Sequence, residues 1–360
     1  MELEGTARTC VPISVVIPVF ERPALLEAAL VSVGCQSVAP AEIIVVDDGS
    51  SNPESILRAA GERGATVVRQ KNAGPAAARN AGMQAARAPW IAFLDSDDLW
   101  LPRKLECQWE ALRSTRRFGA AICDFRMFTD LGSLDETAFD LSHVYQAIPK
   151  RPVGDRTFEL LMPEAGLGAT RTMFVQVSGL VVERKLALGI GGFDPAVARC
   201  EDHEFVMRLF AATRVLSVEQ ALVRYRVHPD SLSRDEVAMR TCAVEVAEKV
   251  LARPDRYPPG ATAIVKQARA ELVMRAAAAH VKSGDVQSCR TILRKELQRN
   301  FSLPMAALLA TTLVLPNRLS RQSAGYLVEC WRRRPWRRPL DWESAASAST
   351  TLIPMLQSQT

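Results

Sequence analysis

The feature that most constrains the fold is an alternation of apolar, β-branched runs with helical segments near the start of the chain. The runs lie at 13–20, 42–46 and 65–69, and helices are predicted between them at 24–33 and 53–61. Strands that alternate with helices form βαβ units, which build a mostly parallel sheet. This pattern predicts the α/β class, with a ligand crevice at the carboxyl ends of the strands.

A fourth apolar run, 91–94, ends abruptly in the carboxylates Asp95, Asp97 and Asp98. Carboxylates this close raise one another's pKa unless a cation lies among them, and oxygen-rich clusters suit Mg²⁺ or Mn²⁺. An acidic turn that caps the next helix would use the same residue type. The run alone leaves both interpretations open.

Composition narrows the class of protein. The 360 residues are 48% hydrophobic and 24% charged with a net charge of +5, so nothing in the bulk charge indicates a nucleic-acid partner. The eight cysteines are scattered without a C-x-x-C pair, which is typical of reduced packing residues in a cytosolic protein. Residues 1–12 lack the features of a signal peptide, and no apolar run reaches about 18 residues. We therefore expect a cytoplasmic protein without a membrane-spanning helix.

Two further stretches carry candidate polar residues. Arg79, in the Gly- and Ala-rich stretch 72–82, offers a fork that fits a phosphate or a base edge, but spacing alone favours a surface arginine in a solvated salt bridge. Glu201 and Asp202 open a predicted helix, where the helix dipole favours carboxylates whatever their function.

Four blocks, taken together, resemble a known family. They are Val-Val-Ile-Pro-Val-Phe at 15–20, Ile-Val-Val-Asp-Asp-Gly-Ser-Ser at 44–51, Asn-Ala-Gly-Pro-Ala-Ala-Ala-Arg-Asn-Ala-Gly at 72–82 and Phe-Leu-Asp-Ser-Asp-Asp at 93–98. Their order and spacing closely resemble family 2 glycosyltransferases. The resemblance implies a Rossmann-like GT-A catalytic domain over 11–235, and we expect a helical region at 236–315 and a basic, partly disordered tail at 316–360.

The resemblance also implies roles for individual residues. The implied nucleotide-sugar contacts are Pro18, Phe20, Glu21, Asp47, Asp48, Arg79, Asp95 and Ser96. The implied metal ligands are Asp97, Asp95 and His228, with Mn²⁺ or Mg²⁺ as the ion and Asp98 left as a helix cap. A divalent cation would stabilise the charge that develops on a departing nucleoside diphosphate.

The second family signature is Gly-Gly-Phe-Asp at 191–194 followed by Glu201-Asp202. It implies that Asp202 is the general base, with Glu201 as the second candidate. An inverting transfer needs one base that takes the proton from the acceptor hydroxyl as it attacks. His228 lies in a Tyr-Arg-x-His-x-x-Ser pattern familiar from the family, although a lone histidine is more often structural.

The last third of the chain is predicted to be helical at 235–252, 260–283 and 285–299, with a tetratricopeptide-like helix pair that packs onto the catalytic domain. The segment 129–163 is predicted to be an acceptor-side insertion. Trp331 and Trp336 lie among arginines, which suits either an anionic membrane surface or a solvated basic tail.

The resemblance thus implies an inverting, metal-dependent glycosyltransferase of surface polysaccharide or glycan biosynthesis. We expect a UDP-type donor and a hydroxyl on a glycan or lipid-linked acceptor. We also expect attachment to the inner face of the cell membrane as a peripheral protein. The alternatives are a non-catalytic sugar-nucleotide or glycan-binding relative, and a nucleotidyltransferase. The second would need a triphosphate loop rich in glycine and lysine near the first strand, which 17–25 does not provide. No G-x-G-x-x-G motif follows that strand, which argues against an NAD-binding domain.

Overall fold

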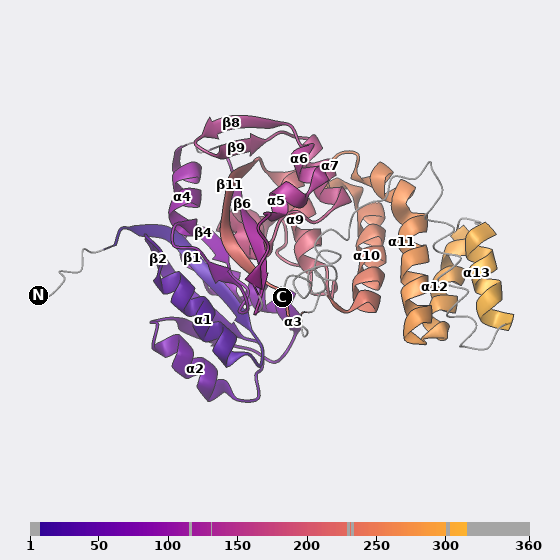
Figure 1. Cartoon of the computed structure of the whole chain (residues 1–360), viewed down its shortest axis with the longest axis horizontal. Helices are drawn as coiled ribbons and strands as arrows, with labels where there is room; N and C mark the ends of the chain where they lie inside the picture. The colour runs from indigo at the N-terminus through magenta and orange to yellow at the C-terminus, as the bar shows by residue number, and fades with distance from the viewer. Residues whose placement is uncertain are drawn as a thin grey trace, which may run out of the picture.

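The computed structural model describes residues 8–114, 117–130, 132–228, 231, 234–299 and 303–314. It shows an α/β domain followed by four helices, α10 to α13, which lie side by side in chain order away from that domain (Figure 1). The predicted tail 316–360, with Trp331 and Trp336, lies outside the described residues.

The elements follow the predicted alternation. The strands are β1 (Cys10–Val19), β2 (Ala39–Asp47), β3 (Thr66–Arg69), β4 (Trp90–Phe93), β5 (Leu99–Trp100), β6 (Ala120–Thr129), β7 (Gly132–Ser133), β8 (Lys150–Gly154), β9 (Thr157–Leu160), β10 (Leu180–Glu183) and β11 (Val215–Arg226). The helices are α1 (Pro23–Gly34), α2 (Pro53–Gly61), α3 (Gly74–Ala85), α4 (Lys104–Ser114), α5 (Ala138–Leu141), α6 (His143–Gln146), α7 (Glu164–Arg171), α8 (Arg184–Gly189), α9 (Glu201–Ala212), α10 (Glu236–Ala252), α11 (Ala261–Ser283), α12 (Val286–Arg299) and α13 (Leu303–Val314).

A single mixed sheet organises the α/β domain, with strand order β3-β2-β1-β4-β10-β6-β11-β9-β8. Strands β1 to β4 are mutually parallel, as the βαβ alternation predicts, and β6 pairs parallel to β11. Strand β10 runs antiparallel between β4 and β6. The α/β class is confirmed, and the parallel strands carry their ends to one edge of the sheet.

Both faces of the sheet are covered because the side chains of each strand alternate between them. In β1, Val15 and Ile17 pack in one apolar cluster and Val16 packs in the other. The first cluster joins α1, α2 and α4, and the second joins α3, α7, α8 and α9. Helix α3 lies very close to the sheet, since a Cβ added at Gly82 would stand 2.3 Å from a methyl group of Val16.

The helical region packs onto the domain through a third apolar cluster. Val197 and Met207 of the α/β domain meet Val246 and Val250 of α10 and Leu272 of α11. The predicted helices at 235–252, 260–283 and 285–299 match α10, α11 and α12 to within one residue at each end. No helix among the described residues combines the length and apolar character that a membrane crossing requires.

Two segments differ from expectation. The strand predicted over 175–182 begins only at Leu180, because Val177–Gly179 forms a short 3-10 turn that aims Ser178 at the acidic cluster. The segment 129–163 forms β7, α5, α6 and the β8–β9 hairpin, and none of its described residues lines the large cleft.

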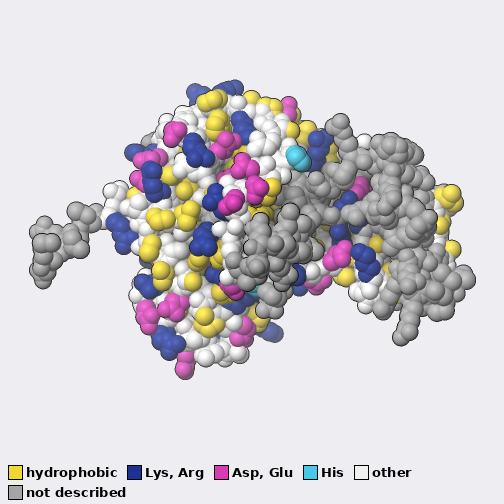
Figure 2. Space-filling view, in the orientation of Figure 1, with side chains coloured by type: hydrophobic (Ala, Val, Ile, Leu, Met, Phe, Trp, Pro, Cys, Tyr) yellow, Lys and Arg dark blue, Asp and Glu magenta, His cyan; other side chains and the backbone are white. Residues whose placement is uncertain are grey.

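The surface of the α/β domain mixes charges of both signs. Figure 2 shows Lys, Arg, Asp and Glu side chains interspersed with hydrophobic ones over the face in view. The part of this face that the structure describes therefore carries no broad patch of one sign.

Candidate active site

A cleft of about 950 Å³ lies at the carboxyl ends of β1 and β4 and extends to α10 and α11. Parallel sheets place their ligands at this edge. The sequence-predicted residues that line it are Pro18, Phe20, Asp48, Arg79, Asp95, Ser96, Asp97, Glu201 and Asp202. Glu21, Asp47 and His228 are not among its lining residues.

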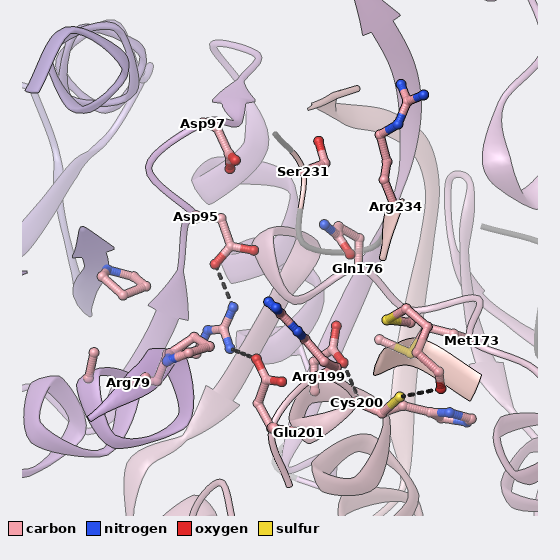
Figure 3. A pocket seen from close by; sticks show the side chains of 18 of the residues that line it. Arg79, Asp95, Asp97, Met173, Gln176, Arg199, Cys200, Glu201, Ser231 and Arg234 are labelled. Atoms are coloured by element: carbon pink, nitrogen blue, oxygen red, sulfur yellow. Dashed lines mark hydrogen bonds and ion pairs between the residues drawn. The ribbon is translucent and has the colours of Figure 1, made fainter. Parts of the chain in front are cut away.

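Arg79 joins the two predicted signatures. Its guanidinium donates one hydrogen bond to Asp95 Oδ1 and another to Glu201 Oε1, each at 2.7 Å (Figure 3). The side chain is only 5% exposed, so this is not the solvated salt bridge that its spacing also allowed. Burial disfavours the charge of Arg79, but Asp95 and Glu201 outweigh it and raise the pKa. Arg79 Nε has no hydrogen-bond partner among the described residues, which leaves one buried donor beside the cleft.

The side chain of Asp97 contacts both Arg22 and His228. Its Oδ2 accepts a hydrogen bond from Arg22 at 2.6 Å and lies 3.1 Å from His228 Nε2. Burial would raise the pKa of Asp97, but His228 and Arg22 outweigh it and lower the pKa. Nothing in the sequence pattern pointed to Arg22, because its partner lies 75 residues away.

The donor atoms at this point fit a divalent cation. A carboxylate oxygen of Asp97 and an imidazole nitrogen of His228 face each other, and both are ligands that Mn²⁺ accepts. No group of three or more His, Cys, Asp or Glu side chains suited to a metal occurs within the described part of the chain. A bound ion would therefore need phosphate or water oxygens for its remaining positions.

Asp98 does not cap the following helix, as was expected of it. The side chain is fully buried, and its two oxygens accept hydrogen bonds from Ser178 Oγ at 2.6 Å and from the backbone N–H of Arg226 at 3.0 Å. Ser178 Oγ also accepts from the backbone N–H of Asp95. Burial raises the pKa of Asp98 well above its usual range. Asp98 thus anchors the acidic loop to the 3-10 turn before β10 and to β11, and it is not among the lining residues of the cleft.

The acidic turn after β2 is also held by its own carboxylates. Asp48 accepts hydrogen bonds from the backbone N–H groups of Ala73 and Gly74, at 2.9 and 2.8 Å. Asp47 is buried and accepts from the N–H of Ser50. Asp48 lines the cleft, and most of its hydrogen-bond acceptor positions are already occupied. Asp47 stabilises the turn and is not among the lining residues of the cleft.

Glu21 links two segments of the chain in this structure. Its carboxylate accepts hydrogen bonds from the N–H and the hydroxyl of Ser51, which joins the end of β1 to the turn after β2. The neighbouring Phe20 lines the cleft and is 45% exposed. An exposed aromatic ring at the rim of a cleft is suited to stacking on a planar ligand.

Glu201 and Asp202 begin helix α9, as predicted. Asp202 lines the cleft, and its carboxylate accepts a hydrogen bond from the N–H of His203 at 2.7 Å. Burial raises the pKa of Asp202 above its usual value, although Arg79 opposes the shift. Of the two carboxylates, Glu201 is tied to Arg79 and Asp202 carries no side-chain ion pair among the described residues.

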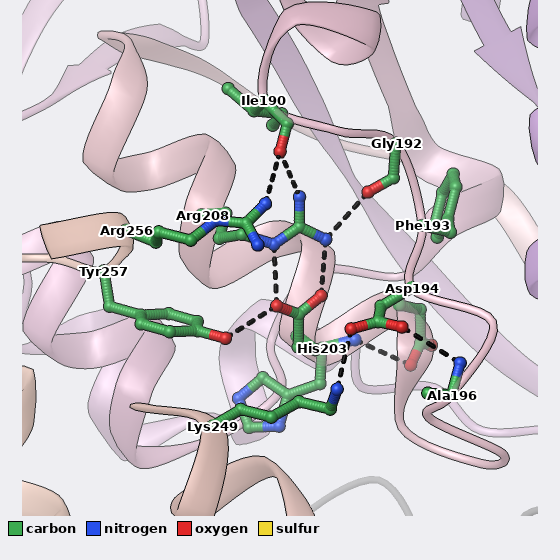
Figure 4. A network of polar contacts seen from close by, with 12 residues as sticks. Ile190, Gly192, Phe193, Asp194, Ala196, His203, Arg208, Lys249, Arg256 and Tyr257 are labelled. Carbon is green, nitrogen blue, oxygen red and sulfur yellow. Dashed lines mark hydrogen bonds and ion pairs between the residues drawn. The ribbon is translucent and has the colours of Figure 1, made fainter. Parts of the chain in front are cut away.

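A buried network fixes the Gly-Gly-Phe-Asp loop behind these carboxylates (Figure 4). Arg208 of α9 pairs with Glu204 and donates to the carbonyl groups of Ile190 and Gly192. Tyr257, which precedes α11, donates to Glu204 at 2.8 Å. The helical region therefore helps to set the position of the loop and of the start of α9.

The comparisons with known proteins agree with this geometry. Residues 14–157 match the sequence profile of Glycosyl transferase family 2. This domain belongs to glycosyl transferase family 2. The remaining question is what the domain does within this chain.

Curated relatives carry the same domain in proteins of different length. The succinoglycan biosynthesis protein ExoW of Rhizobium meliloti is 41% identical over 116 residues, which cover 30% of this chain and 35% of ExoW. The putative glycosyltransferase EpsH of Bacillus subtilis is 27% identical over 61% of this chain and 62% of its own length. An uncharacterized glycosyltransferase of Rickettsia conorii matches at 44% identity over only 16% of its length. The chain thus spans about a third or less of the length of several of these relatives.

Solved structures share the fold over nearly the whole chain. The mannosyltransferase PcManGT of Pyrobaculum calidifontis, solved with GDP-Man and Mn²⁺, has a TM-score of 0.53 and 20% identity, covering 90% of this chain and 87% of its own. S. aureus TarS 1–349, solved with UDP-GlcNAc, has a TM-score of 0.54 and 14% identity, covering 92% and 95%. At these identities the likeness supports the GT-A fold, and it extends into the helical region.

Proposed function

We propose that the protein is an inverting glycosyltransferase that moves a sugar from a nucleoside-diphosphate donor to an acceptor hydroxyl. The observation that carries the proposal is the convergence of Asp97, Asp95 and Asp202 on one cleft, with Arg79 bound to both signatures. The match to the family and the name of ExoW, a succinoglycan biosynthesis protein, support a role in polysaccharide biosynthesis.

The donor would occupy the side of the cleft formed by β1, β4 and the turn after β2. Phe20 would stack on a base, and Asp48, which also lines the cleft, would accept a hydrogen bond from the base. Arg79 Nε and Ser96 would face the ribose and diphosphate, with Asp95 held in place by Arg79. We favour a uridine-type donor, and two of the neighbouring structures hold UDP-GlcNAc and GDP-Man.

Asp97 and His228 would hold Mn²⁺ or Mg²⁺ at the diphosphate, and the ion would supply charge stabilisation to the leaving group. Arg22 contacts the same carboxylate oxygen, so it would release Asp97 as the ion binds and turn its charge to the phosphates. Before the donor binds, Arg22 offsets the charge of Asp97, which keeps the acidic loop compatible with an anionic donor.

Asp202 would act as the general base on the acceptor hydroxyl. Burial raises its pKa, which makes the carboxylate a stronger base than an exposed aspartate. Glu201, bound to Arg79, would keep Asp202 and the donor site in a fixed relation. The proton leaves the acceptor oxygen for Asp202 as that oxygen attacks the anomeric carbon.

Calorimetric titration with a panel of nucleoside diphosphates, in Mn²⁺, Mg²⁺ or EDTA, tests the donor side. We expect one nucleotide to bind only with the metal, and Asp97→Ala to weaken that binding by about tenfold or more. Failure of every diphosphate to bind would favour a non-catalytic relative. Tight, Mn²⁺-dependent binding by Asp97→Ala would remove Asp97 from the metal site.

We also propose that the full chain attaches to an anionic membrane surface at the inner face of the cell membrane, through the basic segment 332–338 that lies outside the described residues. Deletion of residues 316–360 should release the protein from liposomes that contain anionic lipid. Equal partitioning of the full and shortened chains would refute the attachment.

A further inference from the structure

One side of the cleft is not explained by donor binding. Helix α10 lines it with Glu236, Met239, Arg240 and Ala243, and α11 lines it with Leu272 and Arg275. The α10 residues are spaced three, four and seven apart, so they share one face of the helix. The helical region thus forms a wall of the site in addition to packing against the domain.

This wall is strongly basic. Among the described lining residues on this side, Arg199, Arg234, Arg240 and Arg275 carry guanidinium groups, and Glu236 carries the one carboxylate. Figure 3 shows Arg199 next to the Arg79–Glu201 pair, and Arg199 precedes Asp202 by three residues. The basic wall therefore lies next to the proposed base.

The guanidinium group of Arg199 is only loosely paired. It lies 3.9 Å from Asp235, which is longer than a charge-assisted hydrogen bond. A phosphate can compete for this group, because guanidinium binds phosphate oxygens in a two-pronged geometry. Arg240 pairs with Glu236 on the same helix, and Arg275 is buried and hydrogen-bonded to Glu271, so both hold their positive charge in place on this side of the cleft.

An anionic acceptor would explain the positive charge of the wall. Asp95, Asp97, Glu201 and Asp202 make the rest of the cleft acidic and would repel a phosphate, with Arg79 offsetting part of that charge. Guanidinium groups beside Asp202 would offset the repulsion where the acceptor must enter. The apolar side chains of Met239, Ala243 and Leu272 line the same side of the cleft and would contact a sugar face or a lipid stem.

We propose that this wall, defined by Arg199, Arg234, Arg240 and Arg275, is a phosphate-binding acceptor subsite. It would select an acceptor that carries a phosphate or diphosphate near the hydroxyl to be glycosylated. The proposal rests on the proposed function, since it assigns the wall to the acceptor of that reaction. The phosphate could come from a lipid diphosphate or from a soluble phosphorylated sugar, and the test separates the two.

The test is calorimetric binding to the full chain in EDTA, where the metal-dependent donor site is not expected to contribute. The probes are farnesyl diphosphate, glucose 1-phosphate and the neutral alcohol farnesol. We expect a phosphorylated probe to bind and farnesol not to bind. Arg199→Gln and Arg240→Gln should each weaken the binding about tenfold or more, and added salt should weaken it further. Preference for farnesyl diphosphate would indicate a lipid-linked acceptor, and equal binding of glucose 1-phosphate a soluble one.

The matched control is Arg294→Gln, an exposed arginine of α12 outside the cleft, which should bind as wild type does. Arg240→Lys, which keeps the charge, should retain part of the affinity and also reports on a variant that fails to fold. Wild-type protein that binds neither phosphorylated probe would overturn the proposal, as would Arg199→Gln and Arg240→Gln that bind as tightly as Arg294→Gln.

The two proposals fail separately. Metal-dependent nucleotide binding without a phosphate site at the wall removes only the acceptor subsite. Arginine-dependent probe binding without any nucleotide binding removes only the proposed transfer reaction.

Discussion

Arg79 is a buried cation whose hydrogen bonds go to carboxylates from two distant parts of the chain. Asp95 follows β4 and Glu201 begins α9, and each accepts at 2.7 Å. Such a cation is costly to bury unless both partners stay ionised. Arg79 therefore links the folding of the α/β core to the assembly of the site. Its role is to hold the cleft together, which differs from the role of a residue that acts on the substrate.

Asp202→Asn tests the residue proposed to act. The amide is the same size but cannot accept the acceptor proton, so the transfer rate should fall by at least about a hundredfold. Nucleotide affinity should stay within about twofold, because the Asp202 carboxylate is hydrogen-bonded to the N–H of His203 and not to the proposed metal ligands. Turnover and nucleotide titration of the same sample make the comparison, with Asp255→Asn, at an exposed surface ion pair, as the control. Near wild-type turnover would place the base elsewhere.

Lys104 is the most unusual titratable residue away from the cleft. Its ammonium group is fully buried without a hydrogen-bond partner among the described residues, and it lies 4.0 Å from the centre of the Trp100 ring. The ring favours the charged form, but burial lowers the pKa from 10.5 to about 7. Between these two values the unfolded chain binds more protons than the native one, so the free energy of unfolding should rise with pH across that window.

Lys104→Met should therefore stabilise the protein by roughly 2–4 kcal/mol at pH 7 and by clearly less at pH 10. Urea unfolding at both pH values measures the difference. Lys185→Met, at an exposed position of α8, is the matched control and should show no such dependence. An unchanged pH profile in Lys104→Met would mean that Lys104 is charged in the native protein.

At the scale of elements, the packing of α3 on the sheet depends on Gly82. A methyl group there would collide with Val16, which lies in the middle of β1. Gly82→Ala should destabilise the protein by about 1–3 kcal/mol and move Arg79, which lies one turn earlier on the same helix. Thermal unfolding measures the loss of stability.

Gly61→Ala provides the comparison, because Gly61 is also a helical residue, the last of α2, but has open space around its Cβ position. Alanine has the higher helix propensity, so this variant should be neutral or slightly stabilising. Similar changes in stability in both variants would mean that contact with the sheet does not decide the effect of Gly82→Ala.

A comparison of the elements with the sequence pattern also shows which parts of this structure the sequence could predict. The alternation of strands and helices, and the carboxylates that end the strands, follow from local pattern, so the sheet edge and most of the cleft residues were predictable. Asp98 was assigned to a cap because its partners, Ser178 and the N–H of Arg226, are 80 and 128 residues away. The face of α10 that meets the cleft was equally hidden, since helical spacing alone does not tell which side packs against another domain.

At the scale of the whole molecule, the helical region and the α/β domain share one apolar cluster. Val197 and Met207 would be exposed if α10 and α11 were absent. A chain that ends after residue 235 should therefore aggregate or unfold, whereas one that ends after residue 299 should remain folded, since it keeps α10, α11 and α12. Solution scattering and thermal unfolding of the two chains make the test. A stable, monomeric chain 1–235 would show that the cluster is dispensable.

The wall made by α10 and α11 also bears on how such a protein could diversify. The proposed donor side of the cleft is built by strand ends of the α/β domain, and the opposite side by helices that follow it in the chain. Recombination near residue 235 would exchange one side and leave the other intact. Tyr257, which reaches back to Glu204, limits such exchange to partners whose α9 keeps that acceptor. Under the proposed assignments, a chimera that keeps this contact and the shared apolar cluster would inherit its donor from one parent and its acceptor from the other.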